Sequence, residues 1–335
     1  MLHALALTGL AQAQDISFDL DDAKAQQLGI DTGDLEARVG GAIRDQLNLS
    51  DPDTYLGSFA NATLMSTKGM GVDYASNPKK FSVGGTLGTA VSGVPLSFAR
   101  GPEELPEGGY AFMASLYGGV NLGVLTPGDE GPLEHVLLYV NGLGFSPPSS
   151  REFQASMYNF GAHAQIKLGG PVSMKVVEWG GIDLTGGYEQ SFYRLQLSQG
   201  LPITQDLDGA AVTWTAEGNY EISASAGTIP LELSSNLRLA VLTAYLGFGY
   251  DLDPTGATAD SDAVLSGPIE ASAGGRTEDL GTATVSLAGD GIADPNQARV
   301  FVGAQANILV LKVFGHVNVG LNDTYGGFVG VRLAM

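Results

Sequence analysis

The stretch VTWTAEGNYEISA, residues 212–224, decides the fold class because its side chains alternate between two kinds. Val212, Trp214 and every second residue after them are uncharged, whereas Thr213, Glu217 and the other intervening residues are polar. Strict alternation places the two sets on opposite faces of one extended strand. The strand is about twice the usual length of 5–6 residues, so it predicts a long apolar face backed by a wet one.

The same period of two recurs from about Lys79 to the end of the chain, between stretches rich in Gly, Pro and Asp. Long strands with one apolar and one polar face are typical of transmembrane β-barrels. A soluble β-sandwich also alternates, but the strand length and the extent of the pattern favour the barrel. Because a bilayer tolerates no open sheet edge, the sheet must close. The sequence predicts an all-β fold, a closed antiparallel transmembrane β-barrel of about 12 strands, within roughly 10–14.

Composition excludes other classes of function. The 335 residues carry 16 Lys and Arg against 36 Asp and Glu, a formal net charge of −20. This charge repels phosphate groups, which excludes nucleic acid as a partner and argues against electrostatic docking on anionic lipid. The chain has no Cys, so disulfides, thiolate metal sites and Cys nucleophiles are also excluded.

The first 78 residues predict a part that precedes the barrel. Residues 1–13 hold an apolar run and the cleavage-like pattern Ala-Gln-Ala, which predict a signal peptide although no Lys or Arg precedes the run. The alternative is a buried N-terminal strand or helix. Residues 14–78 predict a periplasmic or plug segment, with an amphipathic helix near 34–47 that fills or underlies the lumen. Residues 79–335 form the predicted outer-membrane barrel.

Polar residues in phase on the predicted strands are the candidate lumen lining. In a transmembrane barrel the polar face keeps its water by facing the lumen. The candidates mix bases, acids and histidines, which predicts a lumen of mixed charge. They are His163, Gln165, Lys167, Arg194, Glu217, Glu221, Glu232, Arg238, Arg299, Lys312, His316 and Arg332.

One loop has the spacing of a metal site. DLDPTGATADSD, residues 251–262, nearly matches the calcium loop D-x-[DN]-x-[DN]-G-x5-E, with Thr255 at a ligand position and Asp262 replacing the Glu. Oxygen atoms of Asp251, Asp253, Thr255, Asp260 and Asp262 would bind calcium weakly. The alternative is an acidic, solvated outer loop. No other cofactor is expected.

Few features of the sequence indicate catalysis. Neither HExxH nor GxSxG occurs in the chain. His163 and His316 are in phase with other polar lumen residues, and an outer-membrane hydrolase would have to pair one of them with a Ser. No spacing indicates such a pair, so the sequence predicts a protein that is not an enzyme.

Three stretches carry a resemblance to a known family: STKGMGVDYASNPKKFSVG (66–84), TIPLELSSNLRLAVLTAYLGFGYDLD (228–253) and QARVFVGAQANILVLKVFGHVNVGL (297–321). Overall the chain resembles Gram-negative outer-membrane β-barrels, and these stretches resemble the Lsa36-type surface (lipo)protein family of spirochaetes and other bacteria. The resemblance implies a surface-exposed outer-membrane protein, with an adhesive role in spirochaetal members, and it transfers no ligand-binding residue. Lipid-anchored members need a Cys, which this chain lacks. Residues 54–84 faintly resemble the start of long-chain fatty-acid transporter barrels, where a helical hatch fills the lumen.

Two functions remain open. The first is a porin-like channel that transports small solutes across the outer membrane of a Gram-negative-type bacterium. The second is a cell-surface adhesin whose outer loops bind an extracellular ligand. Outer-membrane lipids are expected partners in both cases. A filled lumen with ordered outer loops favours binding, whereas an open bore with clustered charges favours passage.

Overall fold

The computed structural model describes residues 13–46, 52–93, 108–126, 131–146, 148, 153–174, 176–207, 209–273 and 275–335. The predicted signal peptide, apart from its last residue, lies outside these described residues. Within the described ranges no helix is long and apolar enough to cross a membrane. The described strands form one antiparallel sheet of fourteen.

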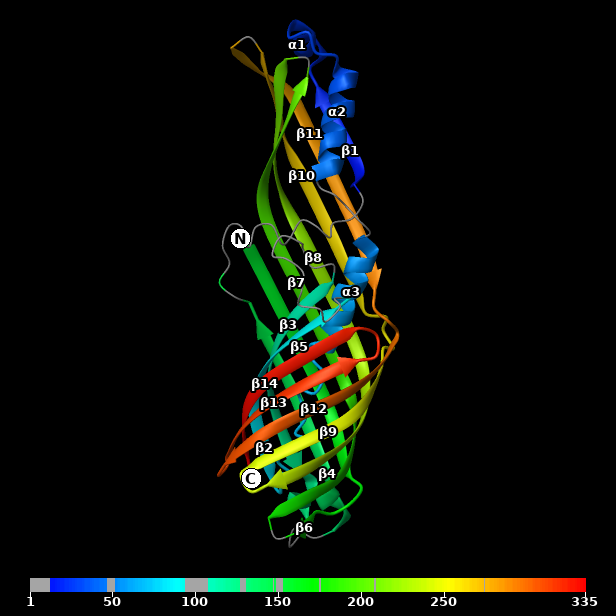
Figure 1. Cartoon of the computed structure of the whole chain (residues 1–335), viewed down its shortest axis with the longest axis vertical. Coiled ribbons are helices and arrows are strands. Elements are labelled where there is room, and N and C mark those ends of the chain that lie inside the picture. The colour runs from blue at the N-terminus through cyan, green and yellow to red at the C-terminus, as the bar shows by residue number, and fades with distance from the viewer. Residues whose placement is uncertain are drawn as a thin grey trace.

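Ten of these described strands close into a barrel, which confirms the predicted fold class (Figure 1). Pairing of β7 with β8 closes the run β8–β9–β12–β13–β14–β2–β3–β4–β5–β7. The barrel strands are β2 Phe81–Ser92, β3 Gly109–Asn121, β4 Val136–Phe145, β5 Phe153–Lys167, β7 Val177–Leu207, β8 Ala210–Leu239, β9 Leu242–Leu252, β12 Asn296–Ile308, β13 Leu311–Gly320 and β14 Thr324–Ala334. The short strand β6, Val172–Met174, pairs with the start of β7, and the 3-10 helices η1 Leu122–Leu125 and η3 Pro132–His135 connect β3 to β4.

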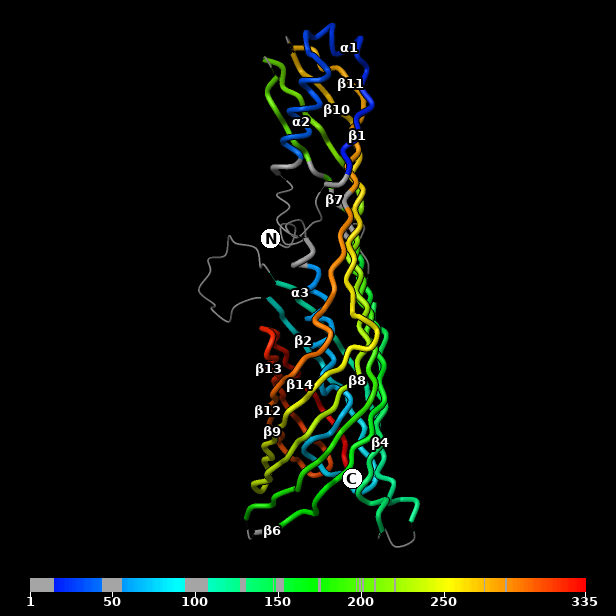
Figure 2. The backbone as a smooth tube through the Cα atoms, turned by 90° about the vertical axis from the view of Figure 1, so that its right-hand side faces the viewer, coloured from blue at the N-terminus to red at the C-terminus, as the bar shows by residue number. Residues whose placement is uncertain are grey.

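Strands β7 and β8 continue far beyond the barrel and carry a second part of the sheet, which we call the extension (Figures 1 and 2). They have 31 and 30 residues, about three times the 9–11 that cross a bilayer. In the extension β8 pairs with β10 (Thr258–Ala273), β10 with β11 (Arg276–Ile292), and β11 with β1 (Ala13–Leu20). We call the extension end of the molecule upper, and the end with the turns at 240–241 and 309–310 lower.

Three helices connect β1 to the barrel. Helices α1 (Asp22–Gln27) and α2 (Thr32–Gln46) lie beside the extension, and α3 (Pro52–Met65) reaches the upper mouth of the barrel, where it contacts β2, β3 and β14 (Figure 2). Asp31 begins α2 by accepting a hydrogen bond from the Asp34 N–H at 3.0 Å. Leu35, Val39 and Ile43 of the helix predicted near 34–47 are buried against the extension, so α2 lies beside the extension and does not fill or underlie the lumen as predicted.

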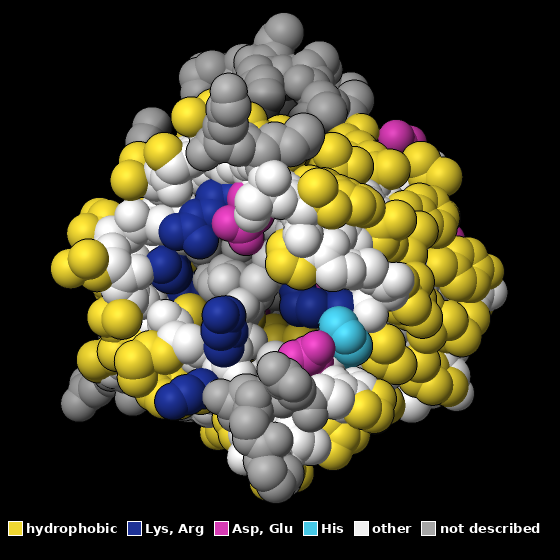
Figure 3. Space-filling model, turned by 90° about the horizontal axis from the view of Figure 1, so that it is seen from below, with side chains coloured by type: hydrophobic (Ala, Val, Ile, Leu, Met, Phe, Trp, Pro, Cys, Tyr) yellow, Lys and Arg dark blue, Asp and Glu magenta, His cyan; other side chains and the backbone are white. Residues whose placement is uncertain are grey.

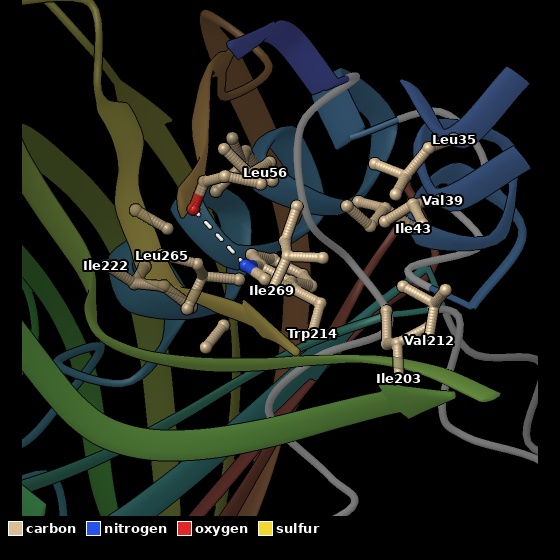
Figure 4. Packing of buried hydrophobic residues seen from close by; sticks show 14 of the residues in the cluster. Leu35, Val39, Ile43, Leu56, Ile203, Val212, Trp214, Ile222, Leu265 and Ile269 are labelled. Atoms are coloured by element: carbon tan, nitrogen blue, oxygen red, sulfur yellow. Dashed lines mark hydrogen bonds between the residues drawn. The ribbon is translucent and has the colours of Figure 1, made fainter. Parts of the chain in front are cut away.

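The opening stretch, 212–224, belongs to the extension rather than to the barrel wall. Trp214 is fully buried, and its indole N–H donates to the Ala283 carbonyl at 3.2 Å. Val212 and Ile222 lie in the same apolar cluster as side chains from α2 and α3 (Figure 4). The alternation therefore correctly predicts a strand with an apolar face, but protein rather than lipid covers that face.

The barrel wall has the distribution of faces that a bilayer requires. Large apolar side chains are exposed on its outer face, among them Leu87, Leu116, Leu233, Leu246 and Val302. The upper part of this outer face is rich in exposed aromatic rings: Tyr110, Phe112, Phe145, Tyr158, Phe160, Phe192 and Tyr250. The 10 residues of β13, at about 3.3 Å per residue and the usual tilt, span about 25 Å, the height of the apolar band in such barrels.

Candidate functional site

The chain between α3 and β2 runs through the barrel, and we call residues 66–80 the lumen segment. All residues from 66 to 75 are buried. The Tyr74 hydroxyl donates to Glu232 of β8 at 2.7 Å, and the Asn77 amide donates to Asn236, closer to the lower turn of the same strand, at 3.3 Å. The segment therefore enters at the upper mouth and descends along β8 to the lower mouth, where β2 begins.

Lys68 of the lumen segment lies in an acidic layer in the upper part of the lumen. Its ammonium nitrogen lies 2.8 Å from Glu189 Oε2 and 3.8 Å from Asp251 Oδ1. Arg299 pairs with Asp251, 2.7 Å from Nε to Oδ2, and with Glu232. These charged side chains are all buried, so each depends on its partners rather than on water. Without Lys68 the wall would hold three carboxylates against one guanidinium.

Asp73 of the lumen segment lies in a basic layer below it. Its Oδ1 is 2.5 Å from Arg332 Nη1, and it also accepts two backbone N–H groups of its own segment. Lys167 lies 3.5 Å from Asp183, and Lys312 is buried near the lower turn, where it donates to a backbone carbonyl. The wall here has three bases and one acid, the opposite excess to the layer above. Lys68 therefore meets the acidic layer, and Asp73 the basic layer, only when the lumen segment runs downward in this register.

Glycine on both surfaces lets the segment and the wall approach closely. A Cβ on Gly71 of the lumen segment would lie 2.4 Å from Asn141 Oδ1, and one on Gly249 of β9 would lie 2.8 Å from Arg299 Cζ. Both distances are below any ordinary contact, so a side chain at either position would force Asn141 or Arg299 to move. Gly71 thus lets the lumen segment approach β4, and Gly249 leaves room for Arg299 beside β9.

The two candidate histidines of the barrel both face the lumen. The His316 ring stacks on Phe328, with centroids 4.4 Å apart, and on Tyr74, with centroids 5.6 Å apart. His163 Nε2 lies 3.6 Å from Glu189 Oε1, the carboxylate that pairs with Lys68. Both imidazoles thus contact the lumen segment or a wall residue that binds it.

The structure brings together most of the predicted lumen residues and places others elsewhere. Those that face the lumen are His163, Gln165, Lys167, Glu232, Arg299, Lys312, His316 and Arg332. Arg238 is exposed at the lower end, where its Nε donates to the Ala240 carbonyl. Arg194, Glu217 and Glu221 lie outside the lumen, at and above the upper rim, and Arg194 pairs with Glu221 at 2.6 Å. Alternation continues along β7 and β8 from barrel to extension, so it does not mark where the lumen ends.

The five predicted calcium ligands do not converge. Asp251 faces the lumen, whereas Asp253 accepts the backbone N–H of Thr255 in its own loop at 3.1 Å. Asp260 and Asp262 stand on the exposed face of β10. Across the ranges that the structure describes, no group of three or more His, Asp or Glu side chains could hold a metal ion. The spacing spans a strand end, a loop and a strand start, whose side chains point in different directions.

The face of the extension away from its buried cluster is acidic and rich in hydroxyl groups. A shallow pocket of about 340 Å³ there is lined by Glu221, Asp260, Asp262 and Asp290, with Ser223 beside them. The strand register sets Asp260 opposite Asp290 and Asp262 opposite Glu221. Glu221 is paired with Arg194, and the facing Asp260 and Asp290, with Asp262, leave a negative field on this face.

Most of the lumen segment falls within the plug segment predicted at 14–78, but its charged residues were not among the candidate site residues. Its Lys68 and Asp73 are isolated charges in a Gly-containing stretch with no strand alternation. A charged side chain in such a stretch needs a counterion from elsewhere in the chain. The sequence therefore signalled, through these two charges, that the stretch contacts a distant part of the protein. The same residues open the first stretch that resembles a known family, 66–84.

A closed antiparallel barrel with an apolar outer wall and an ion-paired interior defines the class of transmembrane β-barrels, in this case with the lumen occupied by its own chain. Within that class, the family model described as Lsa36-like matches residues 11–335. The chain belongs to the Lsa36-like family.

The comparison with solved structures finds outer-membrane barrels, at low identity and low TM-score. Omp33 of Acinetobacter baumannii is 10% identical over 77% of this chain and 99% of its own, with a TM-score of 0.25. The translocator domain of the autotransporter NalP from Neisseria meningitidis is 9% identical over 77% of this chain and 89% of its own, with a TM-score of 0.29. A Pseudomonas aeruginosa FadL homologue is 8% identical over 83% and 97%, with a TM-score of 0.23. Among curated proteins none matches significantly.

Proposed function

We propose that this protein is a surface-exposed outer-membrane barrel that binds an extracellular partner through its extension, and that it acts without catalysis. The observation that carries the proposal is the lumen segment, which descends through the barrel and is ion-paired to its wall at two levels. A barrel occupied in this way favours an anchoring role over passage of solutes. The acidic, hydroxyl-rich face of the extension favours a partner that exposes Lys and Arg.

An outer position of the extension is supported by the lengths of the connections. Two lower turns, at 240–241 and 309–310, have two residues each, and the longer lower connection, 122–135, contains the 3-10 helices η1 and η3. The upper end instead carries the extension and the connection from β2 to β3, which runs from 93 to 108. Outer-membrane barrels keep short turns in the periplasm and longer loops outside. This asymmetry favours the cell surface for the extension and the periplasm for the lower mouth.

The sidedness is tested with epitope tags in intact cells. A tag after Gly275, at the tip of the β10–β11 hairpin, should be labelled by antibody on intact cells, and a tag after Gly131, in the lower β3–β4 connection, should be labelled only after permeabilisation. The reverse pattern would overturn the proposed orientation. Both variants should keep the slow, heat-modifiable gel migration of a folded barrel.

The partner chemistry is tested by retention on polylysine-coated beads. Asp260→Asn, Asp262→Asn and Asp290→Asn together should lower retention, because they remove the facing carboxylates of the pocket. The matched control is Asp22→Asn, Asp34→Asn and Glu36→Gln together, three exposed acids of α1 and α2. Equal losses in both variants would point to net charge alone and would contradict a binding face.

A solute channel with a mobile lumen segment is the second candidate. It is favoured by buried lumen atoms without a hydrogen-bond partner among the described residues, including both ring nitrogens of His163 and Asn141 Oδ1, which would suit a hydrated path. Planar bilayers separate the two functions. The binding proposal expects the intact protein to be silent and the double variant Lys68→Ala with Asp73→Ala to conduct. Stable open steps from the intact protein would favour the channel.

A further inference from the structure

The lower turns of the barrel expose apolar side chains in an unusual backbone conformation. Ala240 and Leu309 have φ of 50° and 56°, in the left-handed region that favours Gly or Asn. Leu309 is 90% exposed and Val241 is 68% exposed. A turn exposed to water would be more stable with polar residues that readily adopt the left-handed conformation. Apolar residues in these positions indicate that the turns do not face water.

Other connections at the lower end repeat this character. Leu168 and Val176, which flank β6, are both largely exposed. The outer faces of the adjoining strands, at Leu239, Ile308 and Leu333, are apolar up to the turns. The exposed apolar turns are therefore continuous with the lipid-facing wall.

A group of bases lies just inside these turns, and we call it the lower basic ring. Its members are the exposed Lys79, Lys80 and Arg238, whereas Lys167 and Lys312 face the lumen behind them. Figure 3 shows Lys and Arg side chains around a hollow at the lower mouth, with an apolar outer surface around them. The acids that are only partly buried at this end are fewer among the described residues, namely Glu134 and Glu178, while Asp73 and Asp183 face the lumen. A chain with a net charge of −20 thus has a basic lower mouth.

We propose that the lower rim of the barrel is a binding surface for anionic phospholipid. The turns at 240–241 and 309–310 enter the acyl region, and the lower basic ring contacts the lipid phosphates beside them. Two features support this proposal. The turns are continuous with the lipid-facing wall, and the positive charge of the ring complements the negative charge of the lipid phosphates. An amphiphile with an apolar chain and a negative headgroup is the one ligand that satisfies both.

The position of the rim is tested with the native tryptophans. The chain has two Trp, and Trp179 is paired with outward-facing Leu237 at the lower end, whereas Trp214 is buried in the extension. The protein is reconstituted in phosphatidylcholine brominated near the headgroup. Fluorescence of W214F, which keeps Trp179, should be quenched strongly, and that of W179F should not. If W214F fails to fold, the difference between the native protein and W179F gives the same quantity. Unquenched Trp179 fluorescence would overturn the proposal.

The headgroup preference is tested by native mass spectrometry of the micellar protein with phosphatidylglycerol or phosphatidylcholine. Phosphatidylglycerol should be retained preferentially. The triple variant Lys79→Gln, Lys80→Gln, Arg238→Gln should lose that preference by at least about fivefold, the factor for one base at an anionic surface. The control Lys24→Gln, Arg38→Gln, Arg276→Gln, with bases on the extension side, should keep it. Equal retention of both lipids, or full competition by millimolar inorganic phosphate, would contradict a lipid site.

Discussion

The ammonium nitrogen of Lys68 lies 2.8 Å from Oε2 of Glu189, although the two residues are 121 positions apart in the chain. One belongs to a segment without regular structure and the other to a barrel strand. Both side chains are buried, so each charge depends on the other for solvation. The lumen segment is thereby a part of the barrel's charge balance, and its removal would leave acids unpaired inside the wall.

Lys68→Met should destabilise the folded barrel by about 3–5 kcal/mol, because it leaves buried carboxylates without their cation. Urea unfolding in vesicles measures the change. Lys24→Met is the control, since the Lys24–Asp21 pair is exposed and is worth at most about 1 kcal/mol. The double variant Lys68→Met with Glu189→Gln should lose less free energy of unfolding than the sum of the losses in the two single variants. Strict additivity would show that the pair does not couple the segment to the wall.

Gly109→Ala should displace α3 from the upper mouth. A Cβ on Gly109 of β3 would lie 2.2 Å from the backbone of Phe59, and a helix backbone cannot yield as a side chain can. We expect a loss of about 1–3 kcal/mol and faster proteolysis within residues 52–65. Gly118→Ala on the same strand is the control, because its Cβ would meet nothing within 4 Å. Similar behaviour of the two variants would contradict the docking of α3 at this rim.

Leu233→Arg should impair insertion into bilayers, because Leu233 is exposed on the outer wall of β8. A cation near the middle of the membrane costs about 2–4 kcal/mol in such a barrel. Thr215→Arg, on the same strand but in the extension, should insert normally. The folded fraction is read from heat-modifiable migration on a gel. Equal insertion of both variants would show that β8 is not divided between lipid and water as described.

Trp214→Ala should loosen the extension and leave the barrel folded. The side chain is fully buried between the sheet and helices of the N-terminal part, and its loss costs about 3–5 kcal/mol of local stability. We expect proteases to cut the extension of the reconstituted variant while a membrane-protected barrel fragment remains. Loss of the barrel together with the extension would mean that the two parts unfold as one unit.

The antiparallel barrel could be predicted from the sequence because the direction of a strand side chain follows from its position alone. His163, Gln165 and Lys167 share the inner face of β5 for this reason. The location of Glu217 and Glu221 could not be predicted, because β8 alternates in the same way in the lumen wall and in the extension. The calcium spacing misled for a related reason, since residues 251–262 leave one strand and enter another.

The sequence by itself determined that the chain forms long two-faced strands, that these close into a barrel, and that a helix with an apolar stripe precedes them. These properties depend on the local period of side chains and on the rule that a bilayer excludes open sheet edges. Only the tertiary structure decided what covers each apolar face and what fills the lumen. Trp214 meets protein and Leu233 is exposed on the outer wall, although both stand on the same kind of alternating strand. Likewise Lys68 and Asp73 find their counterions on β7, β9 and β14, and pairing over such separations is set by the closed barrel, not by any local pattern.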